Sequence, residues 1–252
     1  MYDLRTLIIN YGLHIAGLDD LPVELRYLHW KSCDLEVLPS SFNPENLIEL
    51  DLSSSDIKQL WEGRMFIPQL KRLNLGDCGK LISIPDLSDI PSAEGINLEG
   101  CSSLLEIRSS RECPKNLHYL QLSECKNLRS FPSNIHIEGS GFSLSGCISL
   151  TKFPHISGNI KRLDLSWPGV EEVPSTIQCL SKLESLDMSN CKRLKRVSKS
   201  ICELKSLDRL HLLGCRKLES FPDILEGMEL RFLILSRTAI KELPPNCESR
   251  YK

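Results

Sequence analysis

The sequence predicts an α/β solenoid, in which short coils of chain stack and each coil contributes one strand to a parallel β-sheet. Three observations predict this architecture: a nine-residue pattern that recurs along the chain, a nearly constant spacing between its copies, and a proline that often closes a copy. The composition is compatible with such a core, because 41% of the 252 residues are hydrophobic and 25% are charged, as in ordinary globular domains.

The recurring pattern reads Leu-x-x-Leu-x-Leu-x-x-Cys/Ser. Its third apolar anchor falls at positions 9, 30, 52, 75, 98, 122, 144, 165, 188, 212 and 235, so successive copies lie 21 to 24 residues apart. This period lies within the range of leucine-rich repeats. The sequence therefore predicts one leucine-rich-repeat domain over residues 1–245, with about 11 repeats of 21–24 residues. An uncapped tail follows at 246–252, and we expect both ends of the stack to be incompletely covered.

Each copy also indicates its own local structure. The second and third anchors alternate with polar residues, which predicts a short strand with both anchors pointing inward. Stacking then gives a right-handed superhelix with its parallel sheet on the concave face. The convex side is expected to be mostly irregular, with single helical turns at 174–180 and 199–204, where apolar residues have helical spacing. Prolines close many of the convex segments: Pro39, Pro85, Pro132, Pro154, Pro174, Pro222 and Pro244.

Most of the 11 cysteines share one position of the repeat. Zinc requires four converging ligands, whereas these thiols would lie along a line, so a row of small buried residues is the favoured interpretation. No secretory leader is apparent at the start of the chain, and the cysteine count is odd, which favours reduced thiols in a cytoplasmic and possibly also nuclear protein. The shared position holds Cys33, Cys78, Cys101, Cys125, Cys147, Cys191 and Cys215.

Charge is distributed unevenly along the chain. Residues 1–100 carry 16 acidic and 8 basic side chains, whereas residues 101–252 carry 17 acidic and 23 basic ones, which together give the net charge of -2. The small total does not favour a nucleic-acid or membrane partner, and no apolar run is long enough to span a bilayer. The basic run at 192–199 resembles a nuclear address or nucleic-acid patch, but it is interpreted as a solvated convex face because Leu194 and Val197 match inward anchors.

The outward positions of the predicted strands form the candidate partner-binding surface. They include tyrosine, arginine and phenylalanine, which often anchor protein interfaces. The pairs His29–Asp51 and His211–Asp187, the latter with Ser189 nearby, imitate parts of a hydrolytic site, but an open sheet lacks the required pocket and oxyanion hole. We therefore expect no enzyme activity and no cofactor or metal. The candidate contact residues are Tyr27, His29, Asp51, Arg72, Asn74, Tyr119, Gln121, Arg162, Asp164, Asp187, Arg209, His211 and Phe232.

The segment 21–63 has more specific features. It contains Leu25-Arg26-Tyr27-Leu28-His29-Trp30, then Pro39-Ser40-Ser41-Phe42, and then Ile57-Lys58-Gln59-Leu60-Trp61-Glu62-Gly63. These motifs resemble the opening repeats of plant intracellular disease resistance proteins of the Toll/interleukin-receptor-type nucleotide-binding leucine-rich-repeat class. The later copies are similar to the middle repeats of the same family, so that the resemblance covers nearly the whole chain.

The resemblance implies a function. In such receptors the repeats recognise a pathogen effector or a guarded host protein, and they restrain the receptor's own nucleotide-binding domain. No Gly-x-x-x-x-Gly-Lys-Ser/Thr phosphate loop occurs in this sequence, so the nucleotide-binding switch is not part of it. We therefore expect a fragment, a truncated product or an excised domain of a receptor. The alternative is a stand-alone intracellular signalling scaffold or truncated paralogue.

Overall fold

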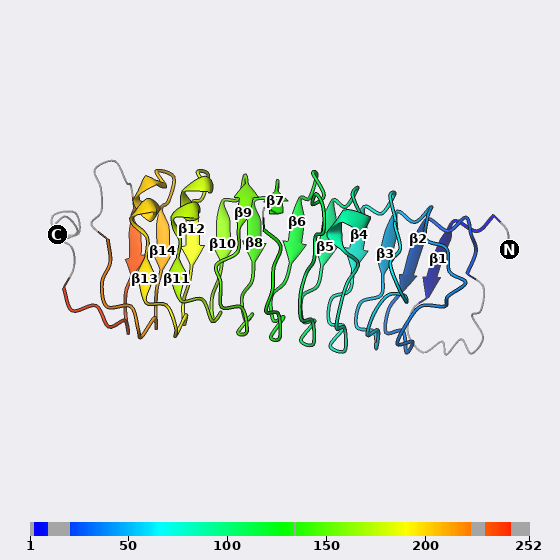
Figure 1. The fold of residues 1–252 in the computed structure, drawn as a ribbon, viewed down its shortest axis with the longest axis horizontal. Helices are drawn as coiled ribbons and strands as arrows, with labels where there is room; N and C mark the ends of the chain where they lie inside the picture. The colour runs from blue at the N-terminus through cyan, green and yellow to red at the C-terminus, as the bar shows by residue number, and fades with distance from the viewer. Residues whose placement is uncertain (1–2, 10–20, 134, 223–229, 243–252) are drawn as a thin grey trace. The chain divides into compact units, whose positions relative to one another are not determined.

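The computed structural model describes residues 3–9, 21–133, 135–222 and 230–242, and the chain forms two compact units, residues 1–132 and 133–252. In both units the chain runs through repeated coils, each with one short strand of a parallel sheet (Figure 1). The predicted leucine-rich-repeat architecture is therefore confirmed. Cys247 and the predicted tail at 246–252 lie outside the described residues.

Unit 1 contains six parallel strands that pair in chain order. The register advances by one repeat at each step, so Leu28 lies beside Leu50, and Leu50 lies beside Leu73. The strands are β1 (Thr6–Ile9), β2 (Tyr27–Trp30), β3 (Glu49–Asp51), β4 (Arg72–Asn74), β5 (Gly95–Asn97) and β6 (Tyr119–Gln121).

Unit 2 contains five main strands with the same parallel register. These are β8 (Gly141–Ser143), β10 (Arg162–Asp164), β12 (Ser185–Asp187), β14 (Arg209–His211) and β15 (Phe232–Ile234). Two further two-stranded parallel sheets pair β7 (Ile135–Ile137) with β9 (Ile156–Gly158), and β11 (Glu172–Val173) with β13 (Arg196–Val197).

The core of each unit consists of the inward anchors of stacked coils. Leu28 and Leu50 are 0% exposed in unit 1, and Leu186 and Leu210 are 0% exposed in unit 2. Burying one such side chain contributes about 1.5–3 kcal/mol. A single three-residue strand could not exclude water from its own leucines, so this contribution exists only because the neighbouring coils cover them.

The turns that leave β2 to β6, β8, β10, β12, β14 and β15 each contain a residue in the left-handed backbone region, two positions after the third anchor. Its N–H donates to the next coil in several repeats, as in the 2.8 Å bonds from Ser54 to the Gly76 carbonyl and from Gly100 to the Ser123 carbonyl. A non-glycine residue in this region costs about 1–2 kcal/mol, yet glycine occupies only three of the ten positions. They are Ser32, Ser54, Asp77, Gly100, Glu124, Gly146, Trp167, Asn190, Gly214 and Arg237, with φ between 55° and 76°.

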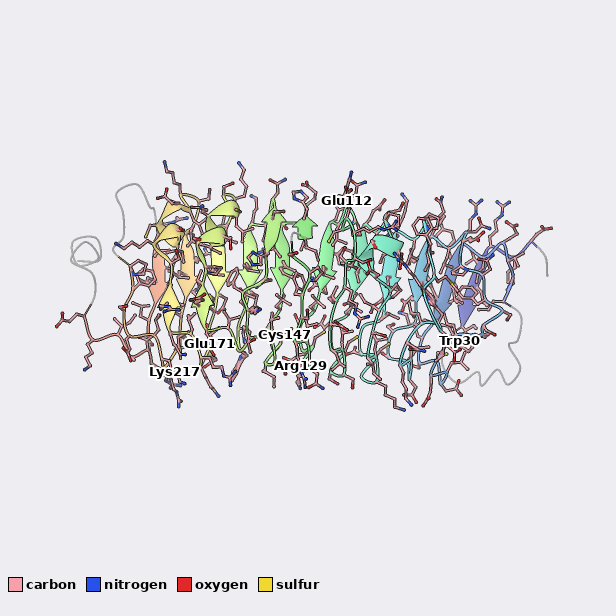
Figure 2. The ribbon with its side chains drawn as sticks, viewed as in Figure 1. Trp30, Glu112, Arg129, Cys147, Glu171 and Lys217 are labelled. Carbon is pink, nitrogen blue, oxygen red and sulfur yellow. The ribbon has the colours of Figure 1, made fainter. Side chains whose placement is uncertain are left out.

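The seven cysteines of the shared repeat position form a row of buried thiols, as predicted, and Figure 2 marks one of them, Cys147. Five of these thiols donate a hydrogen bond to the carbonyl of the third anchor in the preceding coil, at sulfur–oxygen distances of 3.0–3.1 Å. The thiols thus bind carbonyls just beyond the strand ladder. The pairs are Cys78 with Leu52, Cys101 with Leu75, Cys125 with Leu98, Cys191 with Leu165, and Cys215 with Met188.

The opposite side of the coils is mostly irregular, with a few single turns of 3-10 helix. The turns η2 (Ser175–Cys179) and η3 (Lys199–Glu203) confirm the two helical turns that were predicted. A third, η1 (Leu87–Asp89), was not predicted; it begins where the Asp86 side chain accepts the N–H of Ser88. The cue was an aspartate two residues before a serine, which is a common local turn.

The Leu-Trp-Glu-Gly motif joins two coils. Leu60 and Trp61 are buried, and Gly63 adopts a φ of 78° that favours glycine. The following residue, Arg64, donates from Nε and Nη2 to the buried Asp89 carboxylate at 2.6–2.8 Å. A carboxylate 3% exposed would be costly without such donors, so the motif anchors η1 to the preceding coil.

We predict that Gly100→Ala lowers the free energy of unfolding by about 1–2 kcal/mol, because a Cβ is disfavoured at this left-handed position. The added atom would also lie 2.5 Å from Asp77 Oδ1. Gly79→Ala is the matched control, since Gly79 has an ordinary φ and its Cβ would meet nothing closer than 3.7 Å. Urea unfolding of both variants tests the prediction, and equal effects would contradict it.

A second prediction concerns alkaline pH. Burial raises the pKa of Cys33 and of Cys78 from 9.0 to about 11. The folded-state pKa is higher than the unfolded-state pKa, so only the unfolded chain ionises these thiols between pH 9 and 11. Their contribution to the free energy of unfolding is therefore fully present below pH 9 and is lost as the pH rises from 9 to 11. Each thiol should then reduce the free energy of unfolding by about 1.4 kcal/mol per pH unit.

Urea unfolding across this pH range should show a shallower pH dependence for Cys78→Ala than for the unchanged protein. Cys179→Ala serves as the control, because Cys179 is exposed and should leave the slope unchanged. Identical slopes for Cys78→Ala and the unchanged protein would rule out the buried thiol as a contributor.

Candidate functional site

The outward side chains of the main strands form two columns on one face of each unit, here called the strand face. The first column precedes the central anchor of each strand, and the second column follows it. All 13 candidate residues lie on the strand face, which confirms their positions but not a binding role. The first column includes Tyr27, Arg72, Tyr119, Arg162, Arg209 and Phe232; the second includes His29, Asp51, Asn74, Gln121, Asp164, Asp187 and His211.

Most acidic and amide side chains of the second column have a structural role that the sequence interpretation missed. In each, Oδ1 accepts the backbone N–H two residues later, at 2.8–3.1 Å. This hydrogen bond forms an Asx turn just before the left-handed residue. The cue was present in the sequence as a recurrent Asp or Asn between the third anchor and the one before it. The residues are Asp51, Asn74, Asn97, Asp164 and Asp187.

In unit 1, Glu49 connects two basic candidates. Its carboxylate accepts from Arg72 Nη1 at 3.1 Å, and its other oxygen lies 3.0 Å from His29 Nε2. That nitrogen is buried and does not have hydrogen-bond geometry with any partner among the described residues, so the contact is ionic only when the imidazole is protonated. The expected proximity of His29 and Asp51 holds for the backbone register, but the imidazole contacts the first-column carboxylate instead.

The Asp51 carboxylate is itself well satisfied. Burial tends to raise its pKa, but the Ser53 N–H and hydroxyl, the Asn74 amide and Lys31 together lower the pKa below the ordinary value. Lys31 Nζ lies 3.7 Å from Asp51 Oδ2. Asp51 is therefore an ionised, mostly buried group that supports its turn, and only a small part of it is open to a partner.

A shallow hollow of about 420 Å³ lies on the strand face of unit 1, and Arg72, Asn97, Tyr119 and Gln121 contribute to its lining. The position of the Tyr119 ring depends on Gly95, because a Cβ there would lie 2.1 Å from the ring. The tyrosine ring therefore lies across the glycine, and the Asn97 amide donates to Asn74 Oδ1 at 3.0 Å. This hollow offers an aromatic ring, a guanidinium and amides to a partner.

The strand face of unit 2 has a different character. Arg209 lies over the Phe232 ring, with the guanidinium carbon 5.3 Å from the ring centroid, and both Phe232 and Ile234 are exposed. His211 Nδ1 lies 3.5 Å from Asp187 Oδ2, while the other oxygen of Asp187 holds the Asx turn. The surface combines an apolar pair with charged groups that remain open to water.

These groups do not assemble a hydrolytic site on the strand face. Ser189 approaches Asp187 through its backbone N–H and not through its hydroxyl. The predicted proximity of Asp164 and Asp187 is confirmed by their register, and each carboxylate holds a turn.

A serine, a histidine and a glutamate elsewhere in unit 2 resemble a hydrolytic triad more closely, and this arrangement was not predicted. His136 Nδ1 lies 3.1 Å from Ser157 Oγ, and its Nε2 lies 2.6 Å from Glu138 Oε1. The imidazole and the carboxylate are 44% and 38% exposed, unlike the water-excluded setting in which such groups act. The Ser157 hydroxyl also lies within hydrogen-bond distance of the Ile135 carbonyl, so the arrangement connects β7 and β9.

Over residues 3–9, 21–133, 135–222 and 230–242, no three His, Cys, Asp or Glu side chains gather as metal ligands. Within the same ranges, no helix is both long and apolar enough to cross a membrane.

We predict that Asn74→Ala lowers the free energy of unfolding by about 1–2 kcal/mol, since the Gly76 N–H and the Asn97 amide both lose their acceptor. Gln121→Ala, one coil beyond Asn97 in the same column, should change stability by less than about 0.5 kcal/mol, because it removes no turn. Asn74→Asp should retain most of the stability. Urea unfolding distinguishes these variants, and equal losses for Asn74→Ala and Gln121→Ala would exclude the turn as the cause.

Comparison with known proteins identifies relatives by sequence. No family model matches the chain. Disease resistance protein RPS4B of Arabidopsis thaliana is 35% identical over 226 residues, which cover 89% of this chain and 17% of RPS4B. Disease resistance-like protein DSC1 of the same plant is 39% identical over 258 residues, covering 97% of this chain and 21% of DSC1.

TMV resistance protein N of Nicotiana glutinosa is 34% identical over 249 residues, covering 95% of this chain and 22% of that protein. The chain thus spans about a fifth of the length of these relatives.

Structural comparison supports the fold. The chain is similar to a solved structure described as the functional domain of InlJ from Listeria monocytogenes, which includes a cysteine ladder. The TM-score is 0.51 and the sequence identity 17%, over 96% of this chain and 55% of that one. The resemblance drawn from residues 21–63 is confirmed by these sequence relatives: the chain belongs to the plant disease resistance proteins and corresponds to a leucine-rich-repeat region of that family.

Proposed function

We propose that this chain is the recognition module of a plant immune receptor, and that its strand face binds a pathogen effector or a guarded host protein. Solenoid proteins use such extended faces for binding, and the relatives are disease resistance proteins. The observation that carries the proposal is the strand face itself, where tyrosine, phenylalanine and arginine side chains stand exposed beside turn-forming acids and amides.

The two columns contribute differently to this proposal. Second-column residues such as Asn74 and Asp187 use one oxygen for their own turn, so they offer a rigid, partly satisfied polar surface. First-column residues such as Tyr119, Arg72 and Phe232 are exposed, whereas Asn74 and Asp187 are half-buried, and tyrosine, arginine and phenylalanine often provide much of the binding energy at interfaces. The first column is therefore the main contact surface in this proposal, and the second column supplies specificity.

A second part of the proposal is restraint. In the full receptor the same repeats hold the nucleotide-binding domain in its inactive state, and that domain is an intramolecular partner of this region. The site of action is the cytoplasm and also the nucleus. The free, buried thiols support a reducing compartment.

The test compares two variants of the chain expressed in leaf tissue, followed by affinity capture and mass spectrometry. The first variant combines Arg72→Glu, Tyr119→Ala and Phe232→Ala on the strand face. The control combines Lys182→Glu and Lys205→Glu, which replace exposed lysines before β12 and β14. Single contact residues at interface centres often contribute about 2 kcal/mol, or about 30-fold in affinity.

We expect a discrete set of captured proteins that is depleted by the strand-face variant and retained by the control. Purified partners should then bind the strand-face variant at least about 30-fold more weakly in calorimetry. Capture that is identical for both variants would contradict the proposal.

A further inference from the structure

A second surface lies outside the strand face, along the loops that leave β10, β12 and β14 in unit 2. It is called the basic edge and consists of Trp167, Lys192, Arg193, Arg216 and Lys217. The coils stack directly here, because a Cβ on Gly214 would lie 2.6 Å from Asn190 Oδ1 of the preceding coil. Figure 2 marks Lys217 and Glu171 along this same border of the molecule.

At other positions of the loop border, some basic side chains pair with an acid of the coil before them. In unit 1, Lys58 pairs with Glu36 at 2.7 Å and Lys80 pairs with Asp56 at 2.8 Å. In unit 2 the same holds for Lys195, which lies two residues after Arg193 and pairs with Glu171 of the preceding coil at 2.9 Å. Lys58, Lys80 and Lys195 thus follow one rule, pairing with an acid of the preceding coil, whereas Lys126 pairs with Glu124 of its own coil.

The four basic residues of the basic edge depart from this rule. Among the residues that the structure describes, no carboxylate lies within ion-pair distance of Lys192, Arg193, Arg216 or Lys217. The coil before Lys192 and Arg193 has Pro168, Gly169 and Val170 at the same level, and the coil before Arg216 and Lys217 has Lys192 and Arg193 there, so neither has an acid at that level. Four like charges on two adjacent coils repel one another, and an external anion would relieve this repulsion further than Glu171 and solvent screening do.

Glu171 shows how a carboxylate behaves beside this surface. Its hydrogen bond to Lys195, together with the fields of Lys195, Arg193 and Lys217, lowers its pKa below the ordinary value. One internal carboxylate already lies in the field of these groups, while the guanidinium of each arginine remains available for a two-point contact with another carboxylate.

The aromatic member of the basic edge is also unusual. Trp167 is 49% exposed although it occupies the left-handed turn position, with a φ of 73°, which is costly for a bulky side chain. Lys192 Nζ lies 5.4 Å from the centroid of its ring. Exposed Ile148 lies in the preceding coil, where its carbonyl would be 3.0 Å from a Cβ on Gly169. An apolar contact surface therefore adjoins the positive charge.

We infer that the basic edge binds an acidic protein segment in which carboxylates flank an aromatic side chain. The carboxylates would pair with Arg193, Arg216 and Lys217, and the aromatic side chain would pack on Trp167. The positive surface spans two adjacent coils, about 5 Å apart, and Glu171, which lies in the field of Arg193 and Lys217, is itself paired with Lys195. A short acidic protein segment matches a surface of this length, and nucleic acid is the competing occupant that the test distinguishes.

The test measures binding of the full chain to a synthetic peptide in which Asp and Glu residues flank one Phe. Trp30 and Trp61 are buried, so a change in tryptophan emission on peptide binding reports mainly on the exposed Trp167. We expect a saturable fluorescence change that weakens with added salt, because exposed charges are screened. The paired substitution Arg193→Glu and Lys217→Glu should weaken binding by about 10-fold or more.

The control is the pair Lys182→Glu and Lys205→Glu, which changes the net charge equally at the opposite ends of β12 and β14. This control should bind the peptide like the unchanged protein, and circular dichroism should confirm that both variants are folded. Trp167→Ala should weaken the Phe peptide, measured by calorimetry, more than a peptide with Ala in place of Phe.

Three results would overturn the inference. The first is peptide binding that is insensitive to Arg193→Glu and Lys217→Glu, and the second is an equal loss in the lysine control. The third is tighter binding of a single-stranded oligonucleotide or a phosphatidylserine vesicle than of the peptide. The strand-face variant should leave peptide binding unchanged, so failure of this inference is separable from failure of the proposed recognition role.

Discussion

The structure depends on one constraint: a coil of 21–24 residues can bury its leucines only against the coils on either side. Leu28, Leu50 and Leu73 lie side by side because each of them excludes water from the next. In-register stacking then places every other feature at a fixed level of the coil. The left-handed turn, the Asx hydrogen bond and the thiol donor therefore recur together.

The stacking also gives different roles to the two columns of outward side chains. Second-column residues such as Asn74 and Asp164 close the turn that lets the chain leave the strand, so their identity is limited by the fold. First-column residues such as Arg72 and Tyr119 do not form a hydrogen bond that closes a turn of this kind. Variation that alters recognition at low cost in stability is thus expected in the first column and in the loop border.

Much of this arrangement was predictable from sequence, since the alternation of anchors and the 21–24 residue period determine which residues share a column. The register of all 13 candidates followed from that alone. The local hydrogen bonds were harder to predict from the sequence, because they depend on side-chain torsion angles that the repeat period does not specify. His29 illustrates this limit: its backbone neighbour is Asp51, but its imidazole reaches Glu49. The turn η1 depends similarly on the Asp86 and Arg64–Asp89 contacts.

The row of thiols has a consequence for how such a chain changes over generations. Five of the sulfurs donate to the coil immediately before them, as Cys78 does to Leu52 and Cys101 does to Leu75. Duplication or loss of one whole coil would recreate the same bond at the new junction. Loss of a single residue within a strand would instead turn the leucines outward. Unequal recombination in steps of one coil could therefore lengthen or shorten the recognition surface while leaving every remaining junction intact.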